Sequence, residues 1–160
     1  MGAEVATVLR EASADLGLLR LHGQAQFRQL RTQLLAEQMA AHQEMAQLVK
    51  ASRVDGCPLY LQRHVTRPNK VAADHVLHGN SQAKWHLRWR MSVEGNFQHV
   101  TWDEVQPVVS ALPLALAQHA RRVNRRASEL NLIDGLLQGQ ISRVERFLGM
   151  HQSAVGRTES

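Results

Sequence analysis

The chain has 160 residues, which is enough for one domain with a single hydrophobic core. Its 19 lysines and arginines outnumber its 14 aspartates and glutamates, and the resulting net charge of +5 favours a polyanionic partner. A single cysteine excludes an intramolecular disulfide, and no stretch approaches the roughly 18 apolar residues of a membrane span. We therefore expect one cytoplasmic domain over residues 1–160, without a cofactor and without membrane binding.

A long amphipathic helix is predicted for residues 24–51, which contain neither proline nor glycine. It belongs to a helical N-terminal part over residues 15–53, and the turn sequence AspGlyCysPro at 55–58 ends it. Its apolar positions recur at helical spacing: Phe27, Leu30, Leu34, Ala41, Met45 and Leu48.

A small antiparallel sheet with a loop is predicted for residues 58–100. Residues 59–65 and 84–93 each alternate between apolar and polar side chains, as half-buried strands do. The polar segment 69–82 connects these two strands, and a three-residue link containing glycine leads to a return strand at 97–100. The apolar side of the second strand, predicted to face the core, carries Trp85, Leu87, Trp89 and Met91.

The C-terminal part, residues 101–149, is predicted to be helical and is followed by a tail over residues 150–160. Thr101 and Glu104 have the spacing of a capping box, so a helix should begin at Trp102. Pro107 and Pro113 should kink or divide this helix, because proline lacks a backbone N–H donor and clashes with the preceding turn.

An apolar seam with steps of four and three residues follows Pro113, and Asp134 is its only polar member. The seam could pack on the helix at 24–51 or on a second copy in a homodimer, and Gly135 and Gly139 could break it into a hairpin. Together these elements predict a mostly helical α+β fold, with long antiparallel helices and a two- or three-stranded antiparallel sheet. The seam comprises Leu116, Ala120, Val123, Ala127, Leu130, Asp134, Leu137, Ile141, Val144 and Leu148.

The polar side of the second strand is the first candidate site. Basic groups on alternate strand positions are about 7 Å apart, close to the spacing of successive phosphates along a nucleic-acid strand. Such a strand in a hairpin could also enter a DNA major groove. The alternative is a solvated face whose like charges prevent edge-to-edge pairing. The candidate residues are Lys84, His86, Arg88 and Arg90.

An arginine cluster is the second candidate. Four arginines at spacings of one and four residues concentrate positive charge on one stretch of a helix, which either binds anions or pairs internally with carboxylates. The arginines are Arg121, Arg122, Arg125 and Arg126, and the internal partners considered are Glu129, Asp134 and Glu145.

Metal binding and catalysis find less support in the sequence. His75 and His78 stand beside Asp74, and His86 and His99 could face each other across the hairpin, but these spacings are generic and we expect no metal site. The sequence contains no phosphate-binding glycine-rich loop, no nucleophile elbow and no zinc-protease motif, so we expect no enzymatic activity and no catalytic residue.

Four short motifs resemble a family of small uncharacterised proteins from integrating conjugative elements and plasmids of proteobacteria, some of them labelled integrase regulators. The motifs are LeuGlyLeuLeuArg at 16–20, HisLeuArgTrpArg at 86–90, LeuPro at 112–113 and ArgArgAlaSerGluLeuAsn at 125–131. The resemblance implies an accessory protein of a mobile element, with DNA or a DNA-processing complex as partner. It implies no catalytic residue.

The expected function is therefore non-catalytic binding of nucleic acid, with DNA the expected form. Both basic groups would contact phosphates. The alternative is an adaptor or inhibitor that uses the helical seam to bind another protein, in which case the basic residues would meet an acidic protein surface.

Overall fold

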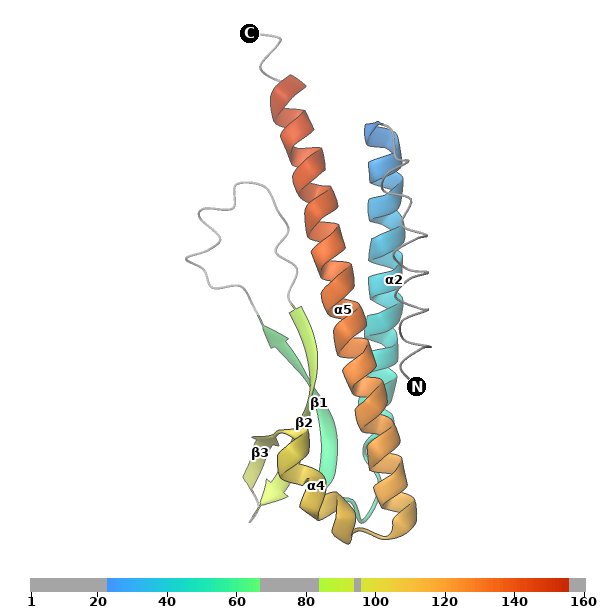
Figure 1. Cartoon of the computed structure of the whole chain (residues 1–160), viewed down its shortest axis with the longest axis vertical. Coiled ribbons are helices and arrows are strands. Elements are labelled where there is room, and N and C mark those ends of the chain that lie inside the picture. Colours follow the sequence, from blue (N-terminus) through green and yellow to red (C-terminus); the bar gives the residue numbers. More distant parts are fainter. Residues whose placement is uncertain (1–22, 67–83, 94–95, 156–160) are drawn as a thin grey trace.

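The computed structural model describes residues 23–66, 84–93 and 96–155, and it has the mostly helical α+β fold that the sequence predicts (Figure 1). Two long helices lie side by side, and a small sheet and a short helix lie at one end of the pair. In chain order the elements are α2 (Gln24–Ala51), β1 (Leu59–Thr66), β2 (Lys84–Val93), β3 (Asn96–Val100), α4 (Trp102–Ala111) and α5 (Leu114–Val155).

The apolar seam of α5 packs on α2 of the same chain, which is the first of the two arrangements considered for it. Leu34 of α2 forms a cluster with Leu137, Ile141 and Val144 of α5, while Met45 joins the larger core near the sheet. The helix α5 runs without interruption through both glycines of the seam region, so the alternative with a break is not observed.

The helix α4 begins as the capping box predicts. The backbone N–H of Glu104 donates to Oγ1 of Thr101 at 3.4 Å, and the N–H of Thr101 donates to the Glu104 carboxylate at 2.6 Å. The Glu104 carboxylate accepts from the backbone N–H of Thr101 and, at 2.8 Å, from the Thr101 hydroxyl, and these two hydrogen bonds lower the pKa of the Glu104 carboxyl. Pro107 lies inside α4, whereas Pro113 lies between α4 and α5 and separates the two helices.

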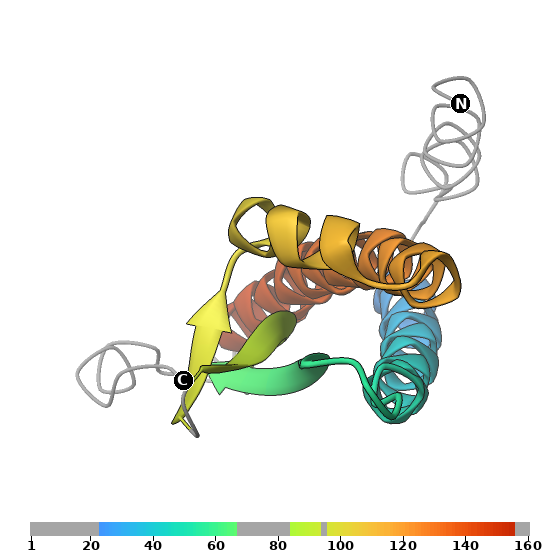
Figure 2. The same cartoon turned by 90° about the horizontal axis from the view of Figure 1, so that it is seen from below.

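The three strands form an antiparallel sheet in the order β1-β2-β3. Its inner face is buried, because Leu59, Leu61, Leu87 and Trp89 pack against α5 and against Val105 of α4 in the main core. Figure 2 shows α4 and α5 on one side of this sheet. The opposite face of the sheet is not covered by any described helix.

β3 pairs only with the second half of β2, from Trp89 to Val93. The first half, from Lys84 to Arg88, pairs with β1 on one side and has no strand on the other within the described part of the chain. That free edge lies beside α5. It forms one wall of the groove discussed below.

Some predictions fall outside the described residues. These are the polar connection at 69–82 with His75 and His78, the first residues of the N-terminal part, and the end of the tail. Among the residues that are described, no helix is both long enough and apolar enough to cross a membrane.

Candidate nucleic-acid interface

The alternation of β2 places its basic side chains on the exposed side of the sheet. Leu87 and Trp89 are 4% and 6% exposed and face the core, so the side chains between them face the other way. Residues opposite one another on antiparallel strands share a face, which adds neighbours from β1 and β3. We call this surface the outer sheet face, and its residues are Tyr60, Gln62, His64, Lys84, His86, Arg88, Arg90, Phe97 and His99.

The charged side chains on the outer sheet face are basic. The sequences of β1, β2 and β3 contain no aspartate or glutamate. Desolvation and the positive charges of Arg88 and His64 lower the pKa of His86. Desolvation and the nearby guanidinium groups of Arg90 and Arg88 also lower the pKa of His99. Both histidines therefore lose their proton more readily than usual until an anion binds beside them.

Two cationic side chains of this face are available to a ligand. Within the described part of the chain, Lys84 and Arg88 make no hydrogen bond or ion pair. Arg90 is held more firmly, because its Nη1 donates to the backbone oxygen of Phe97 at 3.0 Å and its Nη2 lies 3.4 Å from Nε2 of His99. The face therefore combines one positioned guanidinium with two unpaired cations.

Two aromatic rings lie on the outer sheet face, and sequence reasoning did not single them out. Phe97 is 56% exposed, and its ring centroid lies 5.6 Å from that of Tyr60 in an edge-on arrangement. The guanidinium of Arg53 lies 4.3 Å from the centroid of the Tyr60 ring. The sequence alone does not give the strand register that would have revealed this pair. Tyr60 lies on β1 and Phe97 on β3, on either side of β2, and the pairing of the three strands brings their rings together.

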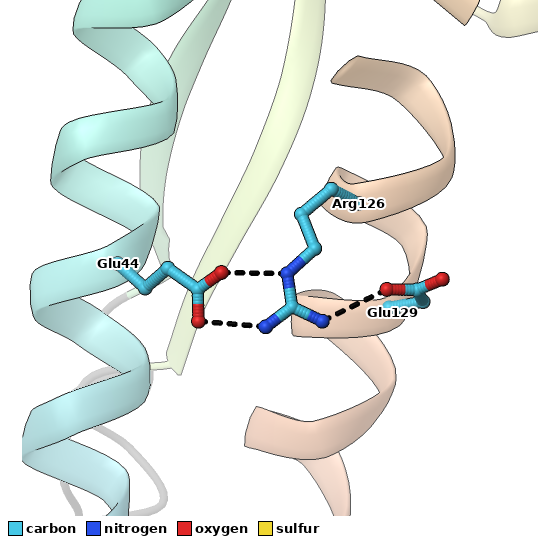
Figure 3. Close-up of polar contacts among 3 residues, drawn as sticks. All are labelled: Glu44, Arg126 and Glu129. Carbon is cyan, nitrogen blue, oxygen red and sulfur yellow. Dashed lines mark hydrogen bonds and ion pairs between the residues drawn. The ribbon is translucent and has the colours of Figure 1, made fainter. Parts of the chain in front are cut away.

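Arg126 of the arginine cluster forms an internal ion pair. Its Nε and Nη2 donate to the two carboxylate oxygens of Glu44 on α2 at 2.6 and 2.7 Å, and its Nη1 donates to Glu129 at 2.8 Å (Figure 3). These hydrogen bonds raise the pKa of Arg126, and the contact lowers the pKa of Glu44. Internal pairing, one of the two interpretations of the cluster, thus accounts for this arginine.

The remaining arginines of the cluster are exposed, but they do not extend the outer sheet face. The buried side of α5 faces the sheet and α2, and it carries Ala120, Val123 and Ala127. Arg121 and Arg125 lie about half a turn away from Val123 on the helix, so they point away from the sheet. The structure therefore separates the two basic groups that the sequence analysis joined into one function.

Asp134 is the centre of a buried polar cluster between α2 and α5. Its side chain is 2% exposed, and its Oδ1 accepts from Nε2 of Gln38 at 3.0 Å and lies 2.7 Å from Nε2 of His42. The His42 ring in turn stacks on Trp85 with a centroid distance of 4.2 Å, and the guanidinium of Arg63 lies 3.7 Å from the Trp85 ring centroid. Trp85 is thus packed against protein groups, as predicted, rather than presented to a ligand.

The histidines of the sheet do not form the pair considered in the sequence analysis. His99 lies opposite Arg90, and His86 lies opposite His64, because β3 reaches only the second half of β2. The prediction that His86 and His99 could face each other is therefore wrong in register. Among the described residues, no group of three or more histidine, cysteine, aspartate or glutamate side chains could hold a metal ion.

Comparisons with known proteins find no matching family model, no matching curated protein and no matching solved structure. The resemblance to small proteins of integrating conjugative elements therefore rests on the four motifs alone and stays a prediction.

Proposed function

We propose that this protein binds single-stranded nucleic acid, with DNA the expected form, through the outer sheet face and without catalysis. In the setting that the sequence motifs imply, it would act as an accessory or regulatory protein of a mobile element. The observation that carries the proposal is the outer sheet face itself. It has two cations that are unpaired within the described part of the chain, the exposed ring of Phe97 beside the half-buried Tyr60, and no carboxylate on three adjacent strands.

The geometry favours a single strand over a duplex. Exposed Phe97 and its neighbour Tyr60 offer ring surfaces to bases, and base stacking on aromatic side chains requires unpaired, splayed bases. Arg88 and Lys84 are available for phosphates, and they are four residues apart on β2, which is about 13 Å, or about two phosphate spacings along a nucleic-acid strand. A strand crossing the sheet could therefore contact aromatic and cationic groups in turn.

Fluorescence anisotropy with labelled single-stranded and duplex DNA tests the proposal. We expect tighter binding of the single strand and an affinity that falls steeply as salt rises, because phosphate contacts release counterions. The double variant Arg88→Ala, Arg90→Ala should weaken binding by about tenfold or more. The matched control is Arg121→Ala, Arg125→Ala, which removes the same charge from the side of α5 that faces away from the sheet.

Three results would decide against the outer sheet face. The first is the absence of binding at low salt. The second is an equal loss of affinity in both double variants, which would indicate a response to net charge. The third is unchanged affinity in Phe97→Leu together with a preference for duplex, which would exclude base stacking.

The second candidate function is an adaptor or inhibitor that binds another protein. The helical seam itself is buried against α2, but Leu132 and Leu136 on α5 are 52% and 46% exposed and neighbour each other at four-residue spacing. Ile133, which is 38% exposed, extends this apolar patch. Sedimentation at increasing protein concentration tests for self-association through the patch, and Leu136→Ser should abolish any that is found.

A further inference from the structure

A groove of about 420 Å³ lies between the free edge of β2 and the second half of α5. It adjoins the outer sheet face, and three basic residues border both. On the side of β2 these are Lys84, His86 and Arg88, while Gln138 and Gly139 are among the residues that form the opposite wall on α5.

The side chain of Asn131 on α5 takes the place of a strand partner for Leu87, and the groove begins next to it. Its Oδ1 accepts from the N–H of Leu87 at 2.8 Å, and its Nδ2 donates to the carbonyl oxygen of Leu87 at 3.1 Å. Peptide groups two residues apart on a strand point to the same edge. The N–H and C=O of Trp85 therefore point at the same edge, toward the groove, which Trp85 also lines.

The wall on α5 leaves room for a ligand. A Cβ added at Gly135 or Gly139 would meet no atom of the described residues within 4 Å, so packing among those residues does not require either glycine. Glycine weakens a helix relative to alanine, and one use of glycine is to let another molecule approach the backbone closely. The two glycines and Ser142 keep this wall low along the length of the groove.

Gln138 presents an unused donor on this wall. Its Nε2 is buried, and it has no hydrogen-bond partner within the described residues. A buried amide donor without a partner destabilises the protein, so an acceptor brought by a ligand would recover that free energy. Asp134 lines the same groove, but it accepts from Gln38 and makes no hydrogen bond with Nε2 of Gln138.

The remaining polar groups of the groove select the charge of the ligand. The groups that can donate are the side chains of Lys84, Arg88, Gln138 and Ser142 and the N–H of Trp85, whose C=O is an acceptor at the same edge. The one carboxylate of the lining, Asp134, is 2% exposed. A small anion rich in acceptor oxygens fits this set, and a doubly charged phosphate monoester offers more acceptors than a carboxylate.

We propose that the groove between β2 and α5 binds a phosphate monoester, carried either by a free mononucleotide or by the end of a nucleic-acid strand. The oxygens of the phosphate would accept from Lys84, Arg88 and Gln138. The site does not require stacking on Phe97 or Tyr60, so it does not depend on the function proposed for the outer sheet face.

Calorimetric titration tests the site with four probes: inorganic phosphate, deoxyadenosine 5′-monophosphate, and one oligonucleotide with and without a 5′-phosphate. Gly139→Leu should fill the groove, and Gln138→Leu should remove its buried donor. Each should weaken binding of the monophosphate by about tenfold, the loss expected for about 1.4 kcal/mol. The control Gln43→Leu adds the same side chain on the exposed side of α2, and Arg121→Ala removes a cation from the side of α5 that faces away from the sheet. Both should leave the monophosphate affinity unchanged.

The outcomes distinguish a free mononucleotide from the end of a strand, and they distinguish the groove proposal from the proposal for the outer sheet face. Binding of the mononucleotide alone assigns the groove to a free ligand, while a gain of affinity from the 5′-phosphate assigns it to a strand end. If no phosphate monoester binds, or if Gly139→Leu binds as the wild type does while circular dichroism shows it folded, the groove proposal is overturned. The oligonucleotide without phosphate tests the outer sheet face independently, because its binding should respond to Arg90→Ala and not to Gly139→Leu.

Discussion

Nε2 of His42 lies 2.7 Å from Oδ1 of Asp134, in the middle of the interface between α2 and α5. The same oxygen accepts from Gln38, so three polar side chains from two helices meet at one point of an otherwise apolar seam. A single polar position in a helical seam can fix the register of two helices, because any slip leaves a buried polar group without its partner. The cluster thus accounts for the polar exception in the seam.

Replacing Asp134 should destabilise the fold through this cluster. We expect Asp134→Ala to lower the free energy of unfolding by about 2 kcal/mol, because Gln38 and His42 lose their acceptor in a buried place. Asp134→Asn keeps an acceptor oxygen and should cost less. Urea unfolding followed by circular dichroism measures both. Equal stabilities of wild type and Asp134→Ala would show that the cluster contributes nothing.

Removing Asn131 should expose the edge of β2. Asn131→Ala deletes two hydrogen bonds to the Leu87 peptide groups, and we expect a loss of about 1 to 3 kcal/mol in unfolding free energy. Asn131→Asp keeps the acceptor for the Leu87 N–H and serves as the comparison. Amide hydrogen exchange gives a local readout, in which the N–H of Leu87 should exchange faster in Asn131→Ala. Unchanged protection of that amide would contradict the prediction.

Gly135→Ala should stabilise the protein. Gly135 lies inside α5, and a Cβ there would meet open space, so the substitution adds helix propensity without a clash. The expected gain is about 0.5 to 1 kcal/mol in unfolding free energy. Thermal unfolding provides the measurement, and a lower melting temperature would show that the space near Gly135 is occupied in solution.

The Arg126 ion pair should matter for stability and not for nucleic-acid binding. Both side chains of the Arg126 and Glu44 pair are about two-fifths exposed, so solvent screening limits their coupling to about 0.5 to 1 kcal/mol. A double-mutant cycle with Arg126→Ala and Glu44→Ala measures this coupling. In the anisotropy experiment, Arg126→Ala should bind DNA as the wild type does, whereas a tenfold loss would place Arg126 in the interface.

Anion binding at the outer sheet face should tighten as the pH falls. The free protein holds the pKa of His86 and of His99 below the usual value, and a bound phosphate favours the protonated form of both. Binding is therefore accompanied by proton uptake at pH values between the pKa of each histidine in the free protein and its higher pKa in the complex. Affinity should rise as the pH falls through that window, by up to about tenfold per unit of pKa shift, and level off below it.

The double variant His86→Gln, His99→Gln isolates this effect, because Arg88, Arg90, Lys84 and His64 remain on the same face. Its affinity for single-stranded DNA should vary less with pH between about 7.5 and 5 than that of the wild type. An identical pH profile in the double variant would show that neither His86 nor His99 carries the dependence.

The sequence predicted most of the fold because its signals are local. Alternation along β2 and the capping box at Thr101 depend on residues a few positions apart, and both are confirmed. The candidate site was predicted only in part. The four basic residues of β2 could be found from one strand, but Tyr60 and Phe97 could not be added without the register of three strands.

By itself the sequence determined which side chains each strand and helix buries, because residue spacing fixes the side of an element on which a side chain lies. Only the tertiary structure decided which elements meet. It paired Arg126 with Glu44, 82 residues away, joined Asp134 to His42 across two helices, and left an edge of β2 open beside α5. The physical reason is that contacts between distant segments depend on how whole elements pack, and one sequence carries no local pattern for them.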